Sequence, residues 1–176
     1  LDFPSPGLQG DGDRHAPQQD ERDMARSTSK AIDKASALEP LPWLEILETG
    51  HEEVDREHRQ LIEDANAVHV IVAGGGSWSE LVATARQMRD RCIVHFATED
   101  KVLKATQFPD LARHLRAHRR ILTEINAIVT DMESAETPNR FHWELALSLR
   151  GILIDHLLRD DLKYKSHLMY YEESRG

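Results

Sequence analysis

Apolar residues recur every three to four positions through four long stretches of the chain, which is the spacing of an amphipathic helix. In the first stretch this stripe includes Val54, Leu61 and Val68. Equivalent stripes predict helices over about residues 52–73, 78–106 and 109–132, and from residue 138 to about residue 160. No segment alternates between apolar and polar residues over a length typical of a strand, so the pattern predicts an all-α fold.

Short polar or glycine-rich segments separate these predicted helices. Gly74-Gly75-Gly76-Ser77 offers a turn followed by an N-cap residue, and Phe108-Pro109-Asp110 interrupts the next helix. Residues 134–139 form a polar loop before the last helix. Because short loops join helices that lie side by side, the expected architecture is an antiparallel up-down-up-down four-helix bundle.

The first forty residues differ in composition from the predicted bundle. Residues 1–20 are rich in Pro, Gly, Asp and Gln, and residues 19–37 show only a weak apolar stripe. Such a composition buries too little apolar surface to drive folding by itself. We therefore expect a flexible or weakly helical, largely irregular extension at residues 1–40 and the helical domain at residues 41–176.

Charge and composition exclude several classes of partner. The formal net charge is −9, which argues against sequence-independent binding of nucleic acid, since that requires a basic surface. No apolar run is long enough to cross a bilayer, and the first residues lack the basic start and apolar stretch of a signal peptide. The sequence thus predicts a cytoplasmic protein without a membrane partner. The single cysteine, Cys92, cannot form an internal disulfide and is expected to be a small core residue.

Five histidines and two carboxylates form one ordered series along the four predicted helices. They are His58, His95-x3-Glu99, His114-x3-His118 and His156-x4-Asp161. Residues four apart share one helix face, so each of the two middle pairs can direct two donors towards one point. Polar residues on a core-facing stripe are costly to bury without partners, which a metal supplies. The set suffices for two metal ions, with iron, zinc, manganese and copper all compatible with these donors.

Two histidine spacings depart from this simple arrangement. His156 and Asp161 are five residues apart and do not stack on a regular helix. We therefore expect the fourth helix to loosen or end near Asp161, which lets that carboxylate reach across the site. His69 returns to nearly the same helix face as His58 three turns later, but is expected to lie outside the ligand set because no second donor on its segment faces it.

Other metal-site patterns fit the chain poorly. A zinc hydrolase of the common type would carry an HExxH motif, which is absent from the sequence. A ferritin-like di-iron site needs a Glu-x-x-His pair on each of two helices. The chain has one such pair, from Glu48 to His51, and it precedes the first predicted helix.

The series extends into longer motifs with the same order and spacing as a known family. These motifs are Val54-Asp55-x2-His58-x2-Leu61, His95-Phe96-x2-Glu99-Asp100, Phe108-Pro109, His114-x3-His118 and His156-x4-Asp161-x2-Tyr164. Over roughly residues 43–170 the chain resembles the hemerythrins, in particular the bacterial hemerythrin domains. In three places it departs from the family pattern: Asp100 stands in place of a second glutamate, and Leu103 and Ile152 stand where many members have methionine and tryptophan. These departures are expected to leave the ligand set untouched.

The resemblance implies two non-haem iron ions joined by an oxo or hydroxo bridge. His114, His118 and His156 would hold one iron and His58 and His95 the other, with Glu99 and Asp161 bridging both. Dioxygen would bind reversibly as hydroperoxide at the two-histidine iron, for storage, delivery or sensing rather than for enzymatic turnover. A dry apolar pocket would protect the bound gas, and its expected lining is Ile62, Phe96, Leu153 and Leu157.

Two alternative functions remain open for such a site. The same irons could act as a peroxidase or process nitric oxide, which would make the protein an enzyme. The domain could also serve as an oxygen- or redox-sensing module whose signalling partner is unknown.

Overall fold

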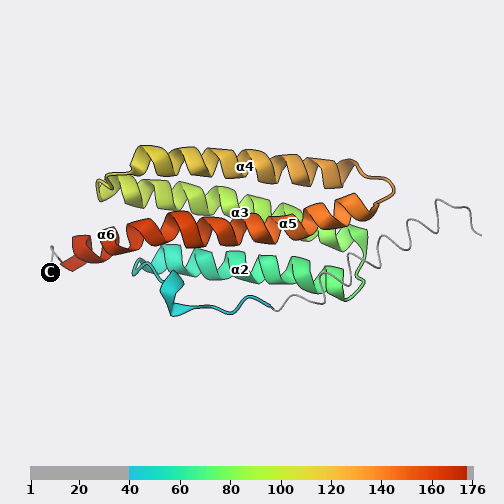
Figure 1. Cartoon of the computed structure of the whole chain (residues 1–176), viewed down its shortest axis with the longest axis horizontal. Coiled ribbons are helices and arrows are strands. Elements are labelled where there is room, and N and C mark those ends of the chain that lie inside the picture. Colours follow the sequence, from blue (N-terminus) through green and yellow to red (C-terminus); the bar gives the residue numbers. More distant parts are fainter. Residues whose placement is uncertain (1–39, 174–176) are drawn as a thin grey trace, which may run out of the picture.

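The computed structural model describes residues 40–173, and these form the expected all-α four-helix bundle (Figure 1). A short 3-10 helix, η1 (Glu45–Leu47), precedes the bundle. The long helices are α2 (Glu52–Ala73), α3 (Trp78–Ala105), α4 (Leu111–Ser134) and α5 (Arg140–His156). No strand occurs among the described residues. The predicted extension at residues 1–40 lies outside the described part of the chain except for its last residue.

Local sequence explains where the helices begin. Ser77 caps α3 through a reciprocal arrangement in which its hydroxyl accepts a hydrogen bond from the Glu80 amide and the Glu80 carboxylate accepts one from the Ser77 amide. Gly75 has a φ of 68° in the preceding turn, a conformation that glycine adopts without steric cost. Asn139 caps α5, and its side-chain oxygen accepts a hydrogen bond of 2.9 Å from the Phe141 amide.

The predicted end of the fourth helix near Asp160 is wrong. After α5 the chain continues through one π-helical turn, η2 (Leu157–Asp161), into α6 (Leu162–Glu173). Residues 162–173 contain no glycine or proline that would stop the helix, and Tyr164 and Leu168 prolong its apolar stripe. Both side chains are buried, in a small cluster with Leu103 and Phe108. The helix therefore loosens at the site and resumes beyond it.

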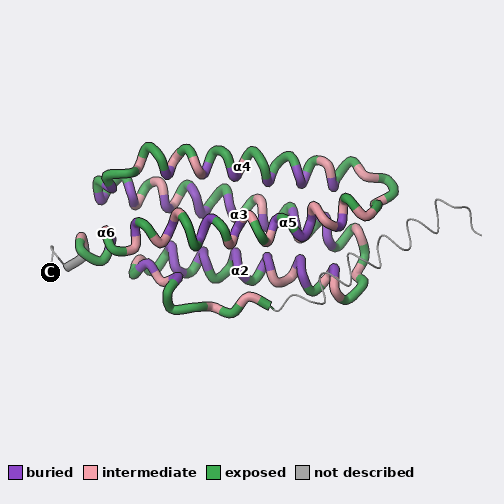
Figure 2. Tube along the Cα trace, in the orientation of Figure 1, coloured by how far each residue is buried: buried purple, intermediate pink, exposed green. Residues whose placement is uncertain are grey.

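The four long helices bury one face each towards a common core (Figure 2). α2 packs against α3 and α5, and α4 packs against the same two helices. Most of the core is apolar, and Cys92 belongs to it: the thiol is fully buried, and burial raises its pKa to about 12. Within residues 40–173, no helix is both long enough and apolar enough to cross a membrane.

Candidate metal centre

The bundle brings all seven residues of the histidine and carboxylate series to one place. His58 comes from the first half of α2, and His95 and Glu99 come from the second half of α3. His114 and His118 lie at the start of α4. Because neighbouring helices run in opposite directions, the start of α2 and of α4 lies beside the end of α3. The last residues of α5 and of η2, His156 and Asp161, complete the set.

These residues form two overlapping groups. One group contains Glu99, His114, His118, His156 and Asp161, and the other contains His58, His95, Glu99 and Asp161. Within each group, one potential donor atom from every residue lies within 4.8 Å of all the others. Glu99 and Asp161 belong to both groups, and all seven residues are buried. The arrangement is that of two adjacent sites sharing two carboxylates.

The π-helical turn explains how Asp161 reaches the site. On an α-helix, residues five apart point about 140° away from one another, so His156 and Asp161 would diverge. A π turn holds more residues per turn and brings positions i and i+5 together. Asp161 Oδ1 accordingly lies 3.1 Å from His156 Nε2. The predicted loosening of the helix at this spacing is confirmed.

Most inward-facing atoms of the site have no hydrogen-bond partner in the protein and are suited to bind a metal. Within the described residues, no hydrogen bond satisfies the Nε2 atoms of His58, His95, His118 and His156, the Oε1 atom of Glu99, or either carboxylate oxygen of Asp161. Buried polar atoms are ordinarily paired, so this many together indicate a missing common partner. Two donors about 2.1 Å from one ion lie about 3.0 Å apart at a right angle. The nearest contacts agree, at 2.8 Å between His118 Nε2 and Glu99 Oε2 and 3.5 Å between His58 Nε2 and Asp161 Oδ2.

The pKa values of the two shared carboxyl groups are shifted in opposite directions. Burial and the negative charge of Glu99 raise the pKa of Asp161 to about 7. Burial also acts to raise the pKa of Glu99, but a hydrogen bond from His114 and the charges of nearby histidines hold it well below its usual range. Burial lowers the pKa of His58, which favours the neutral imidazole that binds metals. Two cations would allow both carboxylates to ionise in this buried space.

Three further carboxylates lie on the outer side of the ligand histidines and were missed in the sequence. Glu57 Oε2 is 3.3 Å from His95 Nδ1, Asp100 Oδ1 is 2.7 Å from His118 Nδ1, and Asp160 Oδ2 is 3.8 Å from His156 Nδ1. Asp100 is not a member of either group, so the seven residues of the set are unchanged by this departure, but Asp100 does hydrogen bond one of the histidines. A signal was present, because each of these acids adjoins a member of the series in the chain.

Two of the outer acids, Asp160 and Glu57, are held as carboxylates by their surroundings. Contact with His156 and with Lys163 keeps the pKa of Asp160 well below its usual range, against the effect of burial. For Glu57, burial acts to raise the pKa, but interactions with His95 and Thr98 outweigh it and lower the pKa. An ionised acceptor on the outer nitrogen leaves the inner nitrogen free to bind a metal.

Tyr164, the last residue of the sequence motifs, lies against the centre from α6. Its side chain is fully buried, and its ring centre is 5.5 Å from that of His114. Burial, together with the negative charges of Glu99 and Asp161, raises the pKa of its hydroxyl well above the usual range. The tyrosine is therefore a neutral phenol beside the shared carboxylates.

The four residues expected to line an oxygen pocket are all buried in the apolar core. Phe96 stacks flat on His118, with ring centres 4.0 Å apart and an angle of 6° between the planes. Ile62, Leu153 and Leu157 are each at most 4% exposed. That these side chains line a path or pocket for a gas stays a prediction.

The remaining described histidines lie outside both groups. His69 is buried but belongs to neither, as expected. His142 Nδ1 accepts a hydrogen bond from the Asn139 amide at the start of α5, and His167 hydrogen bonds the Thr106 carbonyl. These side chains have structural roles at helix ends and between helices.

The chain matches one known protein family and is similar in sequence to several known proteins. The family described as "Hemerythrin HHE cation binding domain" matches residues 49–168, a span that contains the whole series. The chain is similar to a bacteriohemerythrin of Campylobacter jejuni, with 24% identity over 73% of this chain and 92% of the relative. It is 28% identical to a bacteriohemerythrin of Stenotrophomonas maltophilia, over 73% of this chain and 84% of that protein. A myohemerythrin of Riftia pachyptila is 22% identical over 73% of this chain and 94% of its own length.

Proposed function

The chain belongs to the hemerythrin HHE cation binding domain family, whose cofactor is a di-iron centre, and we propose that it binds dioxygen reversibly at such a centre. The observation that carries the proposal is the pair of buried groups with unequal numbers of histidines that share Glu99 and Asp161. Imidazole and carboxylate donors suit iron. The family match and the unsatisfied inner atoms support iron over a structural role for these polar residues.

We assign the seven residues of the two groups as the iron ligands. His114, His118 and His156 would hold one iron, His58 and His95 the other, and Glu99 and Asp161 would bridge them. With one bridging oxo or hydroxo group, the first iron would have six donors and the second five. This difference would leave room for a small ligand at the two-histidine iron.

The protein around the centre would keep the bound gas from being lost as peroxide. When bound, the two irons would supply one electron each and the hydroxo bridge would supply one proton, and we propose that dioxygen is thereby retained as hydroperoxide at the two-histidine position. Reversal requires that water and stray protons stay out, and the burial of all seven residues provides this exclusion. Ile62, Phe96, Leu153 and Leu157 are the proposed apolar lining.

The test is an oxygen cycle on the iron-loaded protein. Anaerobic ferrous protein exposed to oxygen should develop a peroxide-to-iron charge-transfer band that disappears when oxygen is removed. Zinc-loaded protein is the matched control, because zinc can occupy the same donors but supplies no electrons. Irreversible oxidation without this band would contradict oxygen carriage. Steady-state turnover of peroxide or nitric oxide well above that of free iron would support the enzymatic alternative instead.

The biological use of oxygen binding is a further part of the proposal. Storage and delivery require only the reversible site. Sensing would also require a segment or partner that responds to the irons, and the extension at residues 1–40 lies outside the described residues apart from its last one. The cytoplasmic location and the absence of nucleic-acid and membrane partners stay predictions from the sequence.

A further inference from the structure

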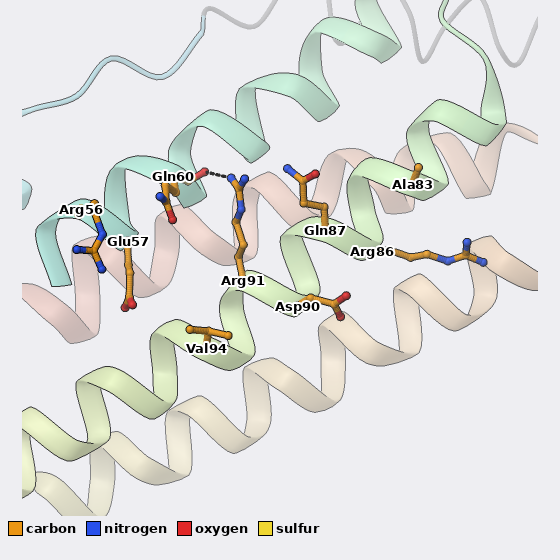
Figure 3. A pocket seen from close by; sticks show the side chains of 9 residues that line it. All are labelled: Arg56, Glu57, Gln60, Ala83, Arg86, Gln87, Asp90, Arg91 and Val94. Atoms are coloured by element: carbon orange, nitrogen blue, oxygen red, sulfur yellow. Dashed lines mark hydrogen bonds between the residues drawn. The ribbon is translucent and has the colours of Figure 1, made fainter. Parts of the chain in front are cut away.

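A surface groove between α2 and α3 reaches one of the outer carboxylates. Its volume is about 670 Å³, and Figure 3 shows Glu57 projecting from α2 towards α3, beside Arg56 and across from Val94. Glu57 both lines this groove and contacts His95. It therefore stands between solvent and a histidine of the two-histidine group.

The contacts of Glu57 fix its position. One carboxylate oxygen lies 3.3 Å from His95 Nδ1, and the other accepts a hydrogen bond of 3.1 Å from the Thr98 hydroxyl. The Glu57 side chain is 11% exposed and that of His95 is 1% exposed. Since the carboxylate can only accept, the shared proton belongs to His95 Nδ1, and Nε2 is left as the metal-binding nitrogen.

The two metal positions differ in their outer carboxylates. In the three-histidine group, His118 faces Asp100 and His156 faces Asp160. In the two-histidine group, His95 faces Glu57, whereas the only ion pair of His58 within the described residues is with Asp161. Among residues 40–173, Glu57 is thus the single outer carboxylate that contacts a histidine of the two-histidine position.

We propose that Glu57 is a positioning residue for the two-histidine iron. It holds the His95 ring in one tautomer and orientation, and as a charged acceptor it makes that imidazole a stronger donor to iron. This inference rests on the ligand assignment of the proposed function. It deepens that function, because the iron concerned is the one that would receive dioxygen.

The experiment compares Glu57→Gln with the unaltered protein after loading with isotopically enriched ferrous iron. Loss of a partner of this kind typically lowers metal affinity by about 10- to 100-fold. We expect chelator competition to remove one iron from Glu57→Gln at correspondingly lower chelator concentration. In the Mössbauer spectrum of the loaded variant, the quadrupole doublet of one iron should shift while the other keeps its wild-type position.

Two further variants control the result. Glu53→Gln alters an exposed glutamate one turn earlier on α2, whose partner is Arg56, and should match wild type in both measurements. Thr98→Val removes only the hydroxyl that holds Glu57, and should shift the same doublet by a smaller amount. Should Glu57→Gln fail to fold, as judged by helicity, Thr98→Val alone decides the question.

The outcomes separate this inference from the proposed function. Unchanged iron retention and unchanged doublets in Glu57→Gln, or equal shifts of both irons, would overturn the role of Glu57. If the shift occurs but wild-type protein shows no reversible oxygen band, the positioning role stands and oxygen carriage fails.

Discussion

The four long helices enclose two core regions of opposite character, one apolar and one polar. At one end the core is apolar, with fully buried side chains such as Leu81, Ile125 and Met132. At the other end the core contains seven polar residues that are equally buried. α4 contributes to both ends, since His118 and Ile125 lie seven residues apart, or about two turns, on one face. Burial alone therefore does not distinguish the two regions, whereas the pairing of their atoms does.

The energetic meaning of burial differs between the two ends. Removing apolar side chains from water stabilises the fold at about 25 cal/mol per Å² without any partner. A buried polar atom costs free energy unless it is paired, and Asp161 has no hydrogen bond at either oxygen within the described residues. The apolar end should thus fold by itself, while the polar end should depend on bound metal.

The largest expected effect is on metal content when His118 is replaced. His118→Ala removes one donor of the three-histidine group and should bring iron from about two per chain towards zero, with loss of colour. Helicity should persist, because burial of the apolar end stabilises the fold without a metal. Iron analysis, an optical spectrum and circular dichroism measure the three quantities. Retention of both irons would show that His118 is not a ligand.

The matching substitution at the apolar end should lower stability and leave the iron content unchanged. Ile125→Ala removes a fully buried side chain and should lower the free energy of unfolding by about 2–5 kcal/mol. Iron per folded chain should stay near two. Urea denaturation with iron analysis of the folded fraction tests this, and Ile125→Val should cost about 0.5–1.5 kcal/mol. A loss of iron as complete as in His118→Ala would mean that the two ends are not separable.

The same contrast explains what the sequence could predict. Helix periodicity and i to i+4 spacing are local properties, so the four helices and the seven members of the series follow from residue order alone. Of the outer carboxylates, Asp160 lies four residues after its partner His156 and follows from the same local spacing. The other two depend on how neighbouring helices are rotated against one another. Glu57 reaches His95 on another helix, and Asp100 reaches His118 on a third. Such contacts cannot be derived from the spacing within one helix.

The course of the chain after Asp161 was missed for a related reason. The five-residue spacing from His156 correctly indicated a departure from α-helical geometry. The same spacing is expected whether the helix loosens or ends, so it does not distinguish these two outcomes. The burial of Tyr164 and Leu168 against Leu103 and Phe108 selects continuation. That packing is formed between segments distant in the chain.

Asp64 is a buried carboxylate outside the metal site, and it can be compared directly with Asp161. Asp64 on α2 is 3% exposed, yet its Oδ1 accepts hydrogen bonds from Gln87 at 2.8 Å and from Arg91 at 2.9 Å. Only its Oδ2 has no hydrogen bond among the described residues. Asp161 is buried to the same degree without such partners. Asp64 shows how this bundle accommodates an ordinary structural carboxylate, in which protein groups replace the metal.

The smallest expected effect is a pH dependence that Asp64 adds to stability. Burial raises its pKa, although Gln87 and Arg91 act to lower it. The folded state therefore holds this proton to higher pH than the unfolded state, and stability falls as pH rises from the ordinary aspartate value through the raised one. We compare the unfolding free energies of metal-free wild type and metal-free Asp64→Asn. The wild-type value minus the variant value should decrease across that window and then level off. The total decrease should be smaller than the loss of stability in Ile125→Ala. A difference that grows with pH would mean that Gln87 and Arg91 outweigh burial, and that Asp64 is stabilised as an anion even without a metal.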